Sequence, residues 1–165
     1  MAFILGKLRL GVIGEADRIQ GGVIGDAVNL ASRLQDMTKR FEVTLLISED
    51  IFRRLQKPER YTMRAIGKIK VKGRKQSVGI FEVLDGEDPV LRNAKQSTES
   101  LFQAGIDLYI QGNVQQAKQR FEACHTTCPQ DGAAKIYLNS CNHYLKDHID
   151  PLTWEGIPYL GTVGE

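Results

Sequence analysis

The sequence predicts an α+β fold in which a small, antiparallel-rich sheet with helices is followed by an all-helical tail. Up to residue 84, strand-like alternation and helix-like periodicity follow one another in the order β-α-β-α-β-β. Beyond that point only helical periodicity remains, and a cluster of charged and turn-forming residues at 85–89 separates the two parts. We therefore expect three regions, residues 1–86, 87–147 and an extended tail at 148–165.

The first region contains four segments with strand character. Leu8, Leu10 and Val12 alternate with polar residues or glycine, which predicts a strand over residues 7–13. Residues 14–22 are polar and bounded by glycine, so a loop or hairpin turn is expected there. Further strands are expected at 43–48, 61–71 and 77–84, with a turn at 72–76 between the last two.

Two helices are expected between these strands. The longer one starts at Asp26, after a glycine-marked turn, and runs to about residue 39 or 40. Its spacing places one set of apolar residues on a single face: Ala27, Leu30, Ala31, Leu34 and Met37. The second helix should run from 49 to 55, with Ser48 as its N-cap.

Asn29 and Arg33 lie four residues apart on the polar flank of the longer helix. An amide and a guanidinium held together near a helix start suit a sugar and a phosphoryl group. Such pairs are also common on the solvated face of an ordinary amphipathic helix, and the pair in isolation is explained more simply in that way.

The second region is predicted to contain packed helices. One helix should present Leu101, Ala104, Gly105, Leu108 and Tyr109 on one face, and Gly112-Asn113 should end it. The next helix ends before Pro129, and a third spans residues 133–146. We expect Leu101, Leu108 and Phe121 to be buried together, and Trp154 to lie against the helices.

The helical region resembles a single tetratricopeptide repeat in the order Gly105, Ala117, Phe121, Pro129. A single repeat needs a neighbour to cover its apolar face. It should therefore pack on the preceding region, on another chain, or on further residues.

Composition limits the function classes. The net charge of +2 argues against nucleic acid or an anionic membrane as the main partner. No apolar run approaches the roughly 20 residues of a membrane span, and residues 1–6 are too short for a signal peptide. The three cysteines suggest reduced thiols and a cytoplasmic location. Cys124, Cys128, Cys141 and the nearby histidines lack zinc-site spacing, so no metal is expected on them.

The string from Gly22 to Leu34 reads Gly-Val-Ile-Gly-Asp-Ala-Val-Asn-Leu-Ala-Ser-Arg-Leu. It resembles a segment of the class III nucleotide cyclases, the adenylate and guanylate cyclase family. The resemblance continues in residues 10–15, in 45–49 and in Val-Lys-Gly-Arg at 71–74, and it covers about residues 6–84. It implies a partial ferredoxin-like cyclase domain that converts ATP, or alternatively GTP, into a 3′,5′-cyclic nucleotide and pyrophosphate, with cyclic AMP as the expected product.

The resemblance also implies roles for individual residues. Asn29 would orient the ribose, Arg33 would stabilise the transition state, and Lys72 would bind the terminal phosphates. On composition alone, Lys72 belongs equally well to the solvated face of a basic hairpin. Gly22 occupies the position that helps to read the base, where the family usually has Asp, Thr or Ser, so base selectivity is open.

The family's metal-binding aspartates precede the strand that begins here near Lys7, so Mg²⁺ or Mn²⁺ in the complete enzyme would have ligands outside this chain. The chain would then supply one side of a site shared with a second copy or with another cyclase chain, and would be inactive alone. The alternative is a catalytically inactive, truncated cyclase module that acts as a regulatory or interaction partner through its helical tail. A further possibility is a helical scaffold on which the first region merely packs.

Overall fold

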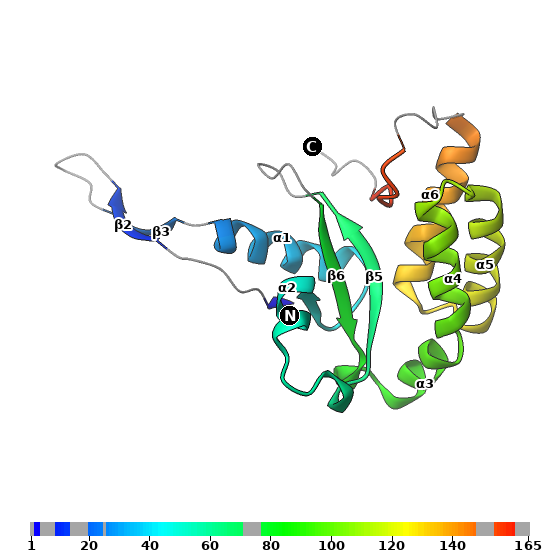
Figure 1. The fold of residues 1–165 in the computed structure, drawn as a ribbon, viewed down its shortest axis with the longest axis horizontal. Helices are drawn as coiled ribbons and strands as arrows, with labels where there is room; N and C mark the ends of the chain where they lie inside the picture. Colours follow the sequence, from blue (N-terminus) through cyan, green and yellow to red (C-terminus); the bar gives the residue numbers. More distant parts are fainter. Residues whose placement is uncertain are drawn as a thin grey trace.

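The structure is a computed structural model of the 165-residue chain. It describes residues 2–3, 9–13, 20–24, 26–70, 77–147 and 154–160, and its description of side chains begins at Ala31. Figure 1 shows two bodies of secondary structure packed side by side, a sheet with its helices and a helical bundle.

Among the described residues, four strands form the main sheet in the order β1 (Ala2–Phe3), β4 (Leu46–Ser48), β6 (Val78–Val83) and β5 (Met63–Ile69). β1 pairs with β4 in parallel, whereas β4–β6 and β6–β5 are antiparallel. The strands expected at 43–48, 61–71 and 77–84 are therefore confirmed, with shorter bounds. The turn expected at 72–76 lies outside the described residues.

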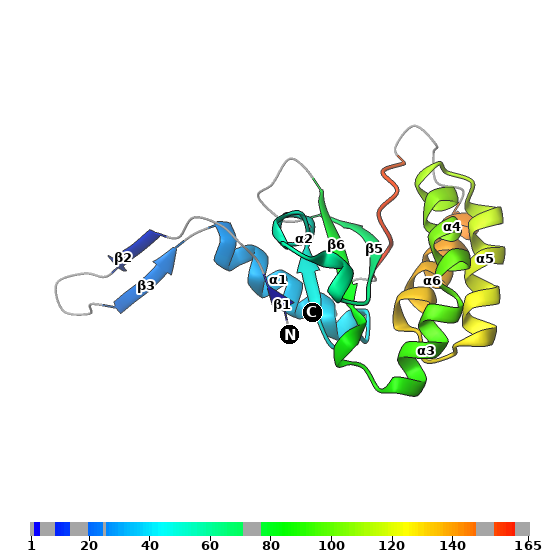
Figure 2. The same cartoon turned by 60° about the horizontal axis from the view of Figure 1, so that its bottom comes forward.

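Two further strands, β2 (Arg9–Ile13) and β3 (Gln20–Ile24), form a separate antiparallel pair. Both views show this pair beyond the first turn of the long helix α1, away from the main sheet (Figures 1 and 2). The strand expected at 7–13 is confirmed over Arg9–Ile13. Of the loop or hairpin turn expected at 14–22, residues 14–19 lie outside the described residues, and 20–22 belong to β3. The ferredoxin-like arrangement stays a prediction, because the described strands divide into two sheets.

The glycine-marked turn expected before α1 is wrong over residues 20–24, which form β3. Gly22 pairs with Gly11 across the hairpin, so both glycines lie in extended backbone. Glycine is a weak strand former on local grounds, but backbone hydrogen bonds to a partner strand satisfy its N–H and C=O groups equally well. β1 was not expected, since two residues are too few to show alternation.

Both helices expected in the first region are confirmed. α1 spans Asp26–Arg40 and α2 spans Glu49–Arg54. The Ser48 hydroxyl accepts a hydrogen bond from the Ile51 amide at 3.4 Å and caps α2, as the sequence indicated. A short 3₁₀ helix, η1 (Pro58–Arg60), follows α2.

The second region is helical as expected. Its helices are α3 (Pro89–Ser97), α4 (Glu99–Ile110), α5 (Val114–Thr127) and α6 (Gly132–Asp147). α4 and α5 are separated at Gly112, whose φ of 79° is left-handed and suits glycine. Gly105 lies directly against the Phe121 ring, and a Cβ there would come within 2.8 Å of that ring. α4 and α5 therefore pack closely, while identity with a tetratricopeptide repeat stays a prediction.

The buried face of α4 differs from the expected one. Phe121 is fully buried, but Leu101 and Leu108 are only partly buried. The residues of α4 that enter the core are Phe102, Gly105, Ile106 and Tyr109. The helix is turned by about one residue, or 100°, so that the rings of Phe102 and Tyr109 contact the Tyr137 ring of α6.

One hydrophobic core runs through both regions. It includes Leu34 and Phe41 from the α1 segment, Ile66 and Ile80 from the sheet, and the aromatic residues of the helical tail. The expectation that the helices pack on the preceding region is confirmed. The chain leaves the sheet through a second 3₁₀ helix, η2 (Leu84–Gly86), and α3 begins at Pro89; a domain boundary near residue 86 stays a prediction.

Residues 154–160 form an extended segment that lies against the helical tail. The Trp154 indole donates a hydrogen bond to the Ile110 carbonyl at 3.2 Å, and its ring packs edge-on against Tyr109 and Tyr144. The expected contact of Trp154 with the helices is confirmed. Within the described part of the chain, none of the helices has the length and apolar character needed to cross a membrane.

Candidate functional site

The candidate site residues Asn29 and Arg33 both lie in α1, one turn apart. Arg33 is exposed and forms no ion pair with another described residue. Gly22 lies in β3, which precedes α1, and Lys72 lies outside the described residues. The structure therefore brings two of the four expected residues onto one helix.

The opposite face of α1 holds this helix in place. Leu34, Met37 and Phe41 are buried in the common core. The helix ends in a tight C-terminal cap, in which the Val43 amide donates to the Thr38 carbonyl at 2.9 Å and Glu42 adopts a left-handed φ of 52°. Arg33 is thus carried on a helix whose apolar face and C-terminal end are fixed.

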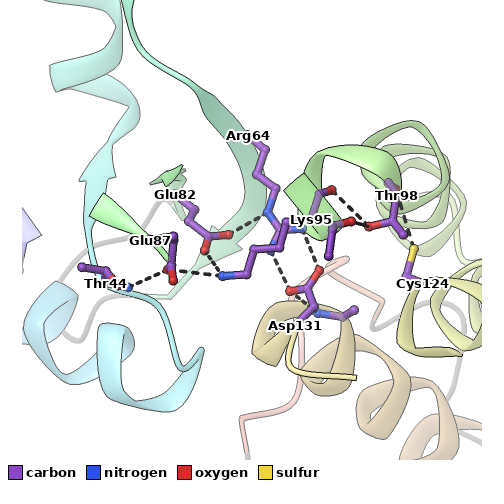
Figure 3. Close-up of polar contacts among 10 residues, drawn as sticks. Thr44, Arg64, Glu82, Glu87, Lys95, Thr98, Cys124 and Asp131 are labelled. Carbon is purple, nitrogen blue, oxygen red and sulfur yellow. Dashed lines mark hydrogen bonds and ion pairs between the residues drawn. The ribbon is translucent and has the colours of Figure 1, made fainter. Parts of the chain in front are cut away.

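A second cluster of charged residues joins the sheet to the helical tail (Figure 3). Arg64 of β5 donates to Glu82 of β6 at 2.6 Å, and it forms a bidentate pair with Asp131, next to α6, at 2.6 and 2.7 Å. Lys95 of α3 donates to the other oxygen of Glu82 at 2.6 Å. We call these four residues the buried ionic network, because each is at most 3% exposed.

Lys95 and Arg64 each have a further contact outside the four residues of the network. Lys95 also lies 3.3 Å from Glu87, whose carboxylate accepts a hydrogen bond from the Thr44 amide at 3.2 Å. The Arg64 guanidinium lies 4.5 Å from the centre of the Phe102 ring, in a cation–π contact. Two cations and two carboxylates thus balance one another where each side chain is buried, and Glu87 adds a further contact to Lys95.

The buried Asp131 and Arg64 each shift the pKa of the other. Burial alone would raise the pKa of Asp131, but the hydrogen bonds and charge of Arg64, together with the charge of Lys95, hold it below its ordinary value. Burial alone would lower the pKa of Arg64, and Asp131 and Glu82 raise it instead. Each charge is therefore stabilised by its partner, and removal of one leaves another buried without compensation.

Aromatic residues pack beside the network in the junction, by which we mean the contact between the sheet and the helical tail. The Tyr137 hydroxyl of α6 donates to the Ile66 carbonyl of β5 at 3.0 Å. It does so at a bulge in β5, where Gly67 has a φ of 106° and a Cβ would overlap the hydroxyl at 1.9 Å. Glycine at 67 is thus required both by the backbone and by the close approach of Tyr137.

Sequence reasoning missed the buried ionic network. Arg64 and Glu82 stand between apolar residues inside two expected strands, which is an unusual place for charges and is the signal that could have found them. Nothing local identifies Asp131 as their partner, because it is 67 residues from Arg64.

No group of three or more His, Cys, Asp or Glu side chains suited to a metal ion occurs among the described residues. All three cysteines are free and buried, and burial raises the pKa of Cys124 to about 11 and that of Cys141 to about 12. Cys124 donates a hydrogen bond to the Thr98 carbonyl at 3.8 Å.

Comparison with known families gives a match over the first region. Residues 4–83, just under half of the chain, match the family described as the adenylate and guanylate cyclase catalytic domain. This range contains β2, β3, α1 and the strands β4, β5 and β6 of the main sheet, and thus all four residues named from the sequence.

Three curated relatives are adenylate cyclases. The terminal-differentiation-specific enzyme of Dictyostelium discoideum is 31% identical over 142 residues, which is 86% of this chain and 7% of that protein. The enzyme of Anabaena cylindrica is 43% identical over 47% of this chain, and adenylate cyclase 1 of Rhizobium meliloti is 34% identical over 48%. The chain spans 16% of the Anabaena protein and 12% of the Rhizobium protein.

The Dictyostelium alignment is the most extensive of the three. Because it includes 86% of this chain, it must also include most of the helical tail. The solved structure of the adenylyl cyclase CyaB from P. aeruginosa is 31% identical and covers 47% of this chain and 38% of its own, with a TM-score of 0.35.

Proposed function

We propose that this chain supplies the Asn29/Arg33 side of an adenylate cyclase active site shared between two chains, which converts ATP into 3′,5′-cyclic AMP and pyrophosphate. The observation that carries the proposal is the cyclase match over residues 4–83, combined with an exposed Arg33 on a helix that is anchored on its other face. The named relatives, all adenylate cyclases, favour ATP over GTP.

Cyclisation of ATP requires a cation beside the α-phosphoryl oxygens, on which negative charge develops. The ribose 3′-oxygen attacks the α-phosphorus, its proton is lost, and pyrophosphate leaves from the opposite side. A guanidinium binds phosphoryl oxygens with paired N–H groups, and Arg33 is available for this because it is exposed. Asn29, one turn earlier, would orient the ribose hydroxyls, and Lys72 would bind the terminal phosphates.

In this proposal, carboxylates of the other chain hold Mg²⁺ or Mn²⁺, which neutralises the triphosphate. The part proposed for this chain is to bind and orient the nucleotide. The partner is accordingly a second cyclase chain that has intact metal ligands.

The test is complementation. The purified chain is assayed with ATP and with GTP in Mn²⁺, alone and mixed with a cyclase variant that keeps its metal aspartates but lacks its transition-state arginine. We expect no turnover by either component alone and cyclic AMP formation by the mixture. Turnover by this chain alone would overturn the one-sided role, and an inactive mixture would contradict the cyclase proposal.

A regulatory role for the tail is the second candidate, and the buried junction favours it over an independent scaffold. Lys95 of α3 and Asp131, which directly precedes α6, share the ionic network with β5 and β6, so a partner that binds the tail could act on the sheet through these contacts. A tail-binding partner that alters turnover of the mixture supports this role.

A further inference from the structure

The extended segment at residues 154–160, here called the strap, contacts both the helical tail and the end of α1. Three of its backbone carbonyls face side chains of other elements. Tyr109 of α4 donates to the Ile157 carbonyl at 3.3 Å, and the Ser140 hydroxyl of α6 lies 3.1 Å from the Tyr159 carbonyl. Arg40, the last residue of α1, donates to the Leu160 carbonyl at 2.9 Å.

The strap is anchored mainly by rings. Trp154 packs against Tyr109 and Tyr144 with ring centres 4.7 Å apart in both pairs. Tyr159 stacks on His143 of α6 with ring centres 4.0 Å apart. These contacts fix the strap to the helices, so its position follows that of the helical tail.

The helical tail reaches the same end of α1 by a second route. Gly132, the first residue of α6, lies so close to Phe41 that a Cβ there would come within 2.2 Å of the Phe41 carbonyl oxygen. Lys135, one turn further along α6, forms an exposed ion pair with Glu42 at 3.5 Å. The strap and α6 thus hold the C-terminal end of α1 from two elements.

Arg40 and Arg33 lie on the same side of α1. They are seven positions apart, so they point within about 20° of one another and are separated by about 10 Å along the axis. Asn29, eleven positions before Arg40, falls on the same line within about 20°. The strap therefore binds the polar face of α1 on which the proposed site residues stand.

We propose that Arg40 is a positioning residue, which couples the helical tail to the Asn29/Arg33 face of α1 through the strap. The inference rests on the proposed function for its catalytic consequence. A helix anchored at its C-terminal end keeps Arg33 in one place relative to the sheet, and small displacements of a charged group at a reacting centre are costly to turnover.

The first measurement is amide hydrogen exchange over residues 31–41 in the full chain. Arg40→Ala removes the hydrogen bond from α1, and Tyr109→Phe combined with Ser140→Ala loosens the strap without touching α1. We expect exchange roughly 2- to 10-fold faster in both variants, as loss of about one hydrogen bond implies. Arg40→Lys should stay close to the unaltered chain, because its ammonium can still donate.

Lys39→Ala is the matched control, since it removes a neighbouring, exposed charge from the same helical turn. Alanine is also the better helix former, so any faster exchange in Arg40→Ala reports the lost contact. Unchanged exchange in both loosened variants would overturn the proposal.

The second measurement is turnover in the complementation assay. Arg40→Ala should lower kcat roughly 2- to 10-fold with little change in the KM for ATP, and Arg40→Lys should restore it. A purely structural role would not produce a kcat effect that the conservative variant rescues. An inactive unaltered mixture contradicts the proposed function. In that case the hydrogen exchange experiment alone tests whether the strap holds the C-terminal end of α1.

Discussion

The buried ionic network and the polar face of α1 use charged residues in opposite ways. Arg64 and Asp131 are buried against partners of this chain, whereas Arg33 is exposed and has no described ion-pair partner. A buried charge needs its partner for the fold to persist, whereas an exposed charge is available to a ligand. Removal of network residues should therefore destabilise the protein, and removal of Arg33 should affect chemistry alone.

The largest effect is expected for Asp131→Ala. It leaves the Arg64 guanidinium buried with one of its two carboxylate partners missing, and such losses cost about 3–5 kcal/mol of unfolding free energy. Urea unfolding followed by circular dichroism measures it. Asp107→Ala is the control, because Asp107 is exposed and accepts one hydrogen bond from Gln103. Equal stability of the two variants would mean that the network does not hold the junction.

Phe121→Ala should cost about 3–5 kcal/mol, because a fully buried ring leaves a cavity. Leu101→Ala is the informative comparison, since the sequence predicted equal burial and the structure leaves Leu101 only partly buried. The loss of unfolding free energy in Leu101→Ala should be distinctly smaller than that in Phe121→Ala. Thermal denaturation of both variants tests the observed face of α4, and a Leu101→Ala loss as large as that of Phe121→Ala would contradict it.

Arg33→Ala should leave the melting temperature unchanged while lowering kcat in the complementation assay. The loss of a transition-state contact of this kind corresponds to about 2–4 kcal/mol in activation free energy. Arg54→Ala, an exposed arginine in α2, serves as the control for lost positive charge. An unchanged kcat in Arg33→Ala would remove Arg33 from the mechanism.

The smallest effect concerns acid pH. The pKa of Asp131 is lowered in the folded state from an ordinary value of 3.8, so its contribution is complete above that value and is lost as pH falls through the lowered pKa. We expect the stability gap between the unaltered chain and Asp131→Asn to shrink between pH 5 and pH 2. Urea unfolding across this range measures the gap, and a constant gap would contradict a lowered pKa.

Local patterns predicted most of the secondary structure because each signal lies within a few residues. The Ser48 cap, the 3.6-residue period of α1 and the break at Gly112 are all of this kind. β3 was missed because its glycines are weak strand formers until β2 pairs with them. α4 carries apolar residues on more than one face, so periodicity could not select the face that α6 and β5 bury.

The residues of the candidate site and its surroundings were likewise predictable only where the signal is local in the sequence. Asn29 and Arg33 were recognised because a contiguous string carries them, and their spacing alone places them one turn apart. The partner of Arg64 could not be inferred, because pairing across 67 residues depends on how α6 docks on β5. The contact of Arg40 with the strap, across 120 residues, was beyond reach for the same reason.

The junction also sets an order of events during synthesis. Arg64 and Ile66 are translated 67 and 71 residues before Asp131 and Tyr137, which later satisfy them. At about 5–20 residues per second, this interval lasts roughly 3–14 s. During it, β5 and β6 exist without the carboxylate and the hydroxyl that complete them. β5 and β6 therefore lack these two side-chain partners until Asp131 and the first turns of α6 have been synthesised.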